Sequence, residues 1–187
     1  MFCYQCEQTA KGQSCTVVGV CGKKPEVAAL QDLLIHALQG LSLYAVEGRK
    51  VGITYSEVDL FTCEAMFSTL TNVDFDPERF VELIKRTVEL RNTLKAKVKA
   101  AGGKTEFTEA AANFMPAPTE EGMIKQAEAV SLKADPTENP DIRSLKHILL
   151  FGIKGVAAYT DHAAILGQKD EKVYAFIHEG LASILGK

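Results

Sequence analysis

Apolar and polar positions alternate along most of this chain with the three- and four-residue spacing of helices. The first such run follows Pro25 and consists of Leu30, Leu33, Leu34, Leu38, Leu41 and Ala45. It predicts an amphipathic helix that starts at the proline and ends near Gly48. Similar runs predict helices over residues 56–71 and 77–101, the last ending at Gly102-Gly103. Three helices with short connections predict a bundle.

Changes in this pattern divide the chain into four parts. Residues 1–24 have no helical period, and residues 25–102 form the predicted three-helix bundle. Residues 103–139 contain several prolines and predict a linker with one short helix near 120–132. Residues 140–187 return to the helical pattern, starting at Pro140.

The last part resembles the first bundle. Shifting residues 25–72 by 115 positions superposes them on residues 140–187 without a gap, with 11 identities in 48 positions. Pro25/Pro140, Gly40/Gly155 and Tyr44/Tyr159 are among the identical pairs. We therefore predict an all-α fold of two consecutive helical bundles related by an internal repeat.

The second bundle is predicted to be incomplete. Lys187 is the equivalent of Asn72, so the second unit has no counterpart of the third helix. We expect Leu181, Ile184 and Leu185 to be covered by something else. The cover would be missing domains of a longer protein, a partner chain or a second copy.

Composition narrows the function only slightly. A net charge of -3 without a basic stripe argues against nucleic-acid binding. No apolar run approaches the roughly 18 residues of a membrane span, and no signal peptide is recognisable. We expect a cytoplasmic protein, and in that compartment a cysteine cluster indicates metal binding or catalysis rather than disulfides.

The chemistry is concentrated at the N-terminus, where Cys3, Cys6, Cys15 and Cys21 lie among glycines. Cysteine thiolates bind zinc and iron–sulfur clusters. Structural zinc sites usually have two close cysteine pairs, whereas only Cys3 and Cys6 are close here. The wider later gaps favour a bulky iron–sulfur cluster, with zinc or free thiols as alternatives. Cys63 and the four histidines show no spacing that suggests a second metal site.

The cysteine segment also resembles a known family. Met-Phe-Cys-Tyr-Gln-Cys-Glu-Gln-Thr-Ala, followed by Gly-x-x-Cys-Thr-x-x-Gly-x-Cys-Gly-Lys, is similar to the opening of the hybrid cluster proteins. These are also called prismane proteins or hydroxylamine reductases. The resemblance continues at 141–145 and 155–159 and covers essentially the whole chain.

The resemblance implies a helical domain of two three-helix bundles, with a 4Fe–4S cubane on Cys3, Cys6, Cys15 and Cys21. A subgroup of the family with wider cysteine spacing holds a 2Fe–2S cluster instead. Family members continue into two α/β domains with a hybrid iron–sulfur–oxygen cluster, where hydroxylamine or nitric oxide is reduced.

This chain departs from the family pattern after its helical part. Only Cys63 follows Cys21, so the ligands of a hybrid cluster cannot be assembled here. We therefore expect an electron-transfer module without catalytic residues of its own, and whether the chain alone is an enzyme stays open. Its expected partners are a redox donor protein and the missing catalytic domains. The alternatives are a zinc-binding or cluster-free assembly module, or a subunit whose catalytic domains lie on another chain.

Overall fold

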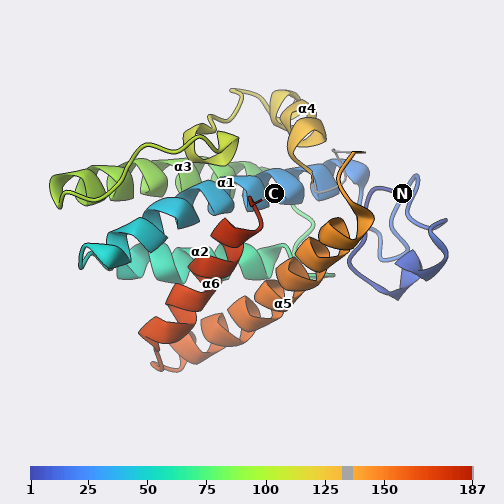
Figure 1. Cartoon of the computed structure of the whole chain (residues 1–187). Helices are drawn as coiled ribbons and strands as arrows, with labels where there is room; N and C mark the ends of the chain where they lie inside the picture. The colour runs from blue at the N-terminus through green and yellow to red at the C-terminus, as the bar shows by residue number, and fades with distance from the viewer. Residues whose placement is uncertain (132–136, 187) are drawn as a thin grey trace.

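The computed structural model describes residues 1–131 and 137–186, and within these ranges the chain is all-helical, as predicted (Figure 1). The elements are α1 (Pro25–Lys50), α2 (Ser56–Ser68), α3 (Pro77–Ala100), α4 (Glu120–Val130), α5 (Pro140–Ile165) and α6 (Glu171–Ser183), with two short 3-10 turns, η1 (Glu7–Lys11) and η2 (Ala110–Asn113). The predicted helix starts at 25, 56, 77 and 140 are confirmed. The ends differ from the predicted ones by up to three residues, and Leu132 lies outside the described residues.

Local chemistry explains where the long helices start. Pro25, Pro77 and Pro140 occupy the first turns of α1, α3 and α5, where a missing N–H costs nothing. The side chains of Asp76 and Asn139 accept hydrogen bonds from backbone N–H groups two residues on, which caps α3 and α5.

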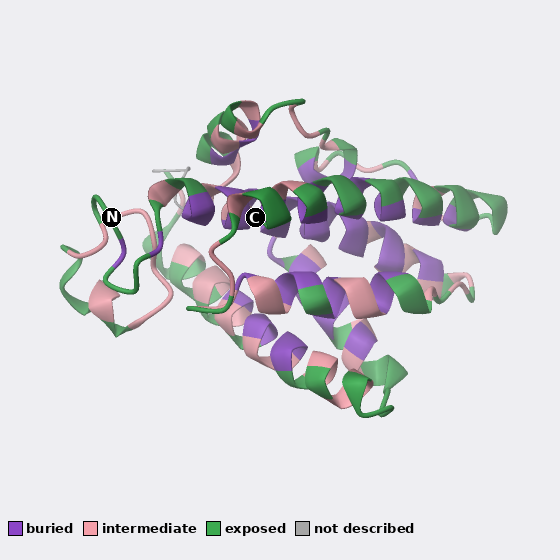
Figure 2. Cartoon of the chain, turned by 180° about the vertical axis from the view of Figure 1, so that it is seen from behind, coloured by how far each residue is buried: buried purple, intermediate pink, exposed green. Residues whose placement is uncertain are grey.

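Helix α1 is the centre of the molecule. It contacts α2, α3, α4, α6 and η2, and 17 of its 26 residues are buried (Figure 2). Residues 33–42 are buried without interruption, which is more than two full turns. The helix is thus enclosed on all sides rather than amphipathic, because a one-sided helix would expose part of every turn.

The segment before α4 also lies against α1. Ala111 and Ala112 of η2 are buried, and the hydroxyl of Tyr44 donates to the carbonyl oxygens of Thr105 and Ala112 at 3.5 and 3.4 Å. At Gly40 an added Cβ would collide with the carbonyl oxygen of Ala111. Glycine at this position lets the backbone of η2 approach the helix closely.

The two halves of the chain are packed crosswise around one continuous core. Helix α6 lies on α1, and α5 lies on α2. The bounds of α5 and α6 are those of α1 and α2 plus 115, so the two helix pairs have equal lengths. Each helix of one half therefore packs on the non-equivalent helix of the other half.

The apolar end of α6 needs no external cover. Leu181 and Ile184 are buried inside this chain and Leu185 is half-buried, which corrects the expectation that a partner must cover them. The exposed apolar face belongs to α5 instead. Tyr159 is 81% exposed, whereas its counterpart Tyr44 is 0% exposed. The same contrast holds for three more exposed residues of α5 and their buried counterparts in α1: Ile142/Val27, Leu145/Leu30 and Ile148/Leu33.

Helix α5 is unusually apolar because it carries large apolar side chains on its exposed face as well as on its buried one. Helix α5 is long enough and apolar enough to cross a membrane, with a mean hydropathy of 1.2 over its most apolar window. A single such helix is weak evidence of a span, because helices in the core of water-soluble proteins pass the same test. The apolar residues at the equivalent positions of α1 are buried inside the protein, so this apolar pattern also fits a helix that packs against protein.

Substitutions at two glycines in equivalent positions, Gly40 of α1 and Gly155 of α5, test how closely η2 packs on α1. We predict that Gly40→Ala destabilises the protein by about 1–3 kcal/mol, because η2 must move away from the new methyl group. Gly155→Ala is the matched control: a Cβ there meets no atom within 4 Å, so it should stabilise the helix by up to about 1 kcal/mol. Urea unfolding monitored by circular dichroism measures both effects, and equal changes in the two variants would contradict this packing.

The buried imidazole of His36 predicts a stability that falls in acid. Burial lowers the pKa of His36 from 6.5 to about 4, so the folded protein keeps this ring neutral while the unfolded chain binds a proton. Its contribution is complete above pH 6.5 and is lost as the pH falls towards 4, up to about 3 kcal/mol. Urea unfolding between pH 7 and pH 4 should therefore show a smaller loss in His36→Gln. The exposed His162→Gln variant should keep the wild-type loss, and an unaltered His36→Gln profile would refute the assignment.

Candidate metal centre

The N-terminal segment folds back on itself at one end of the bundle (Figure 1). The amide of Phe2 donates to the carbonyl oxygen of Cys15 at 3.0 Å. This hydrogen bond holds the backbone next to Cys3, the first cysteine, against the backbone of Cys15, the third. Cys15 itself has a left-handed backbone, with φ of 56°. Non-glycine residues adopt this conformation rarely, and it often occurs where a functional site imposes it.

The four predicted cysteines lie around one cavity. Cys3, Cys6, Cys15 and Cys21 all line a space of about 310 Å³, together with Gln5, Thr9 and Lys23. All four thiols are free; Cys21 is exposed and the other three are half-buried. An added Cβ at Gly19 would lie 3.2 Å from the sulfur of Cys21, so glycine allows the loop to pass close to this thiol.

The four thiols line a cavity that is larger than a single metal ion needs. Zinc binds four thiolates that converge at about 2.3 Å from one point. Among the described residues, no three Cys, His, Asp or Glu side chains are placed to hold one metal ion. Thiols distributed around a cavity of this size fit a group with several metal atoms.

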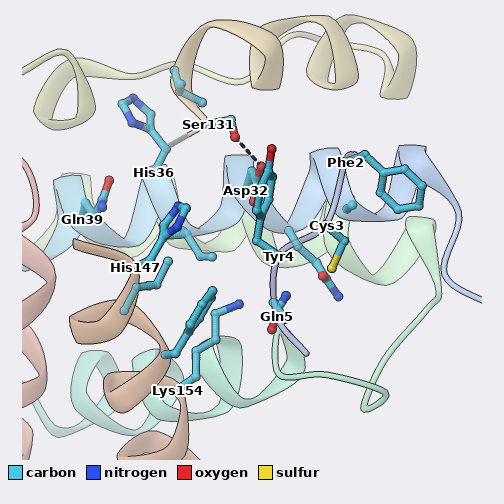
Figure 3. Close-up of a pocket in the computed structure, with 16 residues that line it drawn as sticks. Phe2, Cys3, Tyr4, Gln5, Asp32, His36, Gln39, Ser131, His147 and Lys154 are labelled. Carbon is cyan, nitrogen blue, oxygen red and sulfur yellow. Dashed lines mark hydrogen bonds between the residues drawn. The ribbon is translucent and has the colours of Figure 1, made fainter. Parts of the chain in front are cut away.

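A second, smaller cavity lies behind Cys3. It has a volume of about 50 Å³ and walls of both polar and apolar side chains, and it lies between the N-terminal segment, α1, the end of α4 and α5 (Figure 3). Its lining includes Cys3, Asp32, His36, His147 and Lys154. A space of this size with polar groups on part of its wall can hold a few ordered water molecules.

Two buried lysines adjoin these cavities. Lys23 donates to the side-chain oxygen of Gln31 at 2.7 Å, and Lys154 donates to the carbonyl oxygen of Thr69 at 3.0 Å. Burial lowers the pKa of Lys154 to about 7, and Asp32 opposes this shift. Sequence reasoning missed both residues, although a lysine on the buried side of an apolar helix such as α5 is a usable signal.

Cys63 is separate from the N-terminal site. It is buried in the core of the bundle, and burial raises the pKa of its thiol to about 12, with Asp161 and Asp59 adding to the shift. A thiol that stays protonated is a poor metal ligand. Cys63 therefore packs as a small apolar side chain.

One histidine belongs to a buried polar network that the sequence did not reveal. His178 lies 3.0 Å from Ser42 through Nδ1 and 3.0 Å from Asp59 through Nε2, and Arg49 pairs with Asp59 at 2.6 Å. This set has the residue types of a hydrolase triad, but Ser42 is fully buried and His178 nearly so. No substrate can reach the serine hydroxyl, so the network joins α1, α2 and α6 instead of catalysing a reaction.

Comparison with known proteins supports the sequence resemblance. The model of the Prismane/CO dehydrogenase family matches residues 1–187. Hydroxylamine reductase of Syntrophobacter fumaroxidans is 65% identical over all of this chain and 34% of its own length. Hydroxylamine reductase of Methanocella arvoryzae is 60% identical over 98% of this chain and 34% of its own length. The chain thus spans about a third of these curated relatives, and it belongs to the Prismane/CO dehydrogenase family.

Proposed function

We propose that this chain is an electron-transfer module that holds one 4Fe–4S cluster on Cys3, Cys6, Cys15 and Cys21. The observation that carries the proposal is the single cavity that all four thiols line. Iron–sulfur chemistry is what membership of this family implies. A bound cluster would supply a one-electron redox couple.

The residues around the cavity suit this role. Four thiolates would hold the irons, and Gly19 lets the loop pass close to the sulfur of Cys21. Cys21 is exposed, so one side of the site is open to a redox partner. Val17, Val18 and Val20 are exposed beside it. We propose that a reduced donor protein contacts this apolar rim, because transient electron-transfer complexes need only a small surface.

The destination of the electrons would lie outside this chain. The curated relatives are named hydroxylamine reductases and are about three times as long. We propose that catalytic domains of this kind receive the electrons, and that they or a second copy cover the exposed face of α5. The chain itself is assigned no catalytic residue, and its proposed location is the cytoplasm.

Cysteine variants test the proposed ligands. We expect anaerobically reconstituted protein to contain about four irons and four sulfides per chain, with a brown absorbance that dithionite bleaches. Cys6→Ser should lose most of the iron, because serine does not replace a thiolate ligand well. Cys63→Ser is the matched control and should keep the full cluster, since Cys63 lies apart from the cavity.

Other metal contents would support one of the alternative metal sites. Two irons per chain would indicate a 2Fe–2S cluster on the same cysteines. One zinc without colour would make the chain a structural module, and iron retained in Cys6→Ser would show that the ligands are assigned wrongly.

A further inference from the structure

The two buried lysines lie on either side of the first cysteine. Lys23 lines the cysteine cavity and Lys154 lines the smaller one behind it, while Cys3 lines both. Each lysine is only 1% exposed. In Figure 3 the amine of Lys154 is directed towards the N-terminal segment that carries Cys3 and Gln5. Two lysine side chains are therefore enclosed next to the proposed cluster site.

The hydrogen-bond partners of both ammonium groups are neutral. Lys23 bonds the amide oxygen of Gln31, and Lys154 bonds a backbone carbonyl oxygen. Within residues 1–131 and 137–186, no carboxylate lies within ion-pair distance of either lysine. Asp32 and Cys3 attract Lys154 only at longer range, and Lys23 repels it. Buried charges are normally paired, because an unpaired one is costly. A bound anion at the four cysteines would balance Lys23 and favour the charged form of Lys154, which burial otherwise disfavours.

A thiolate-bound cluster is such an anion. Four thiolates contribute more negative charge than an oxidised cubane core contributes positive charge, and one-electron reduction adds a further negative charge. A nearby cation stabilises the reduced form more than the oxidised form, and burial strengthens this attraction. Both lysines should therefore favour electron uptake.

We propose that Lys23 and Lys154 are the counter-charges of the cluster and raise its reduction potential. The inference rests on the proposed function, since it requires a cluster on the four cysteines. The electron would come from the reduced donor protein, and no bond is formed or broken. The competing explanation is that Lys154 only ties α5 to the end of α2 through Thr69.

The reduction potential separates these two roles. Lys23→Met and Lys154→Met should each keep about the wild-type iron content. At fixed pH and a given potential, each variant should increase the ratio of oxidised to reduced cluster about tenfold. This corresponds to a midpoint about 59 mV more negative for a one-electron couple. An anaerobic optical titration with dithionite and redox dyes measures the midpoint. Lys24→Met is the matched control, because Lys24 is adjacent in sequence but exposed, and it should leave the midpoint unchanged.

The cluster-free protein provides a second measurement. Without the anion the buried cation is a cost, so apo Lys154→Met should melt at a higher temperature than apo wild type. A lower melting temperature, with an unchanged potential in the loaded variant, would assign Lys154 a packing role and overturn the proposal for it. Lys23→Met tests the inference independently if Lys154→Met does not fold.

The outcomes distinguish this inference from the proposed function. Full iron content with the wild-type midpoint in both variants would overturn the lysine proposal and leave the cluster assignment intact. A wild-type protein that assembles no cluster would overturn both.

Discussion

The burial of α1 on all sides over residues 33–42 is the constraint on which the other parts of the structure depend. Four other helices and η2 pack around it, so their positions are set relative to one central element. The same helix begins directly after the cysteine loop, at Pro25, and carries Gln31 and Asp32 into the walls of the cavity behind Cys3. A rigid helix at the base of the loop can hold the thiols in place, because functional groups are positioned best when regular elements support them.

Polar side chains inside this core determine how the helices meet. Gln31 accepts from Lys23 and donates to the carbonyl oxygen of Asp74, which connects the cysteine loop, α1 and the segment before α3. About three turns further along α1, His178 connects Ser42 with Asp59 of α2. Such buried groups are costly unless they are paired, so alternative packings that separate them are disfavoured.

Helices α1 and α5 show how one sequence pattern serves two environments. Their bounds differ by 115 positions and they share Gly, Leu and Tyr residues, yet α1 buries 17 residues and α5 buries five. Helix α3, η2 and α4 enclose α1, and the described chain has no equivalent elements over α5. The apolar face of α5 is therefore exposed within the described chain.

The sequence by itself determined the helical fold class, four helix starts and the family. Helix period and N-terminal caps depend on residues within one or two turns, and the cysteine motif lies within 21 residues. Tertiary structure alone decided that α1 is enclosed, that Leu181 and Ile184 are covered by this chain, and that Lys23 and Lys154 lie buried near Cys3. These features come from contacts such as Thr69 with Lys154 and Ser42 with His178, which join residues 85 and 136 positions apart. Local patterns carry no information about such pairs, because their distance is fixed only when the helices pack.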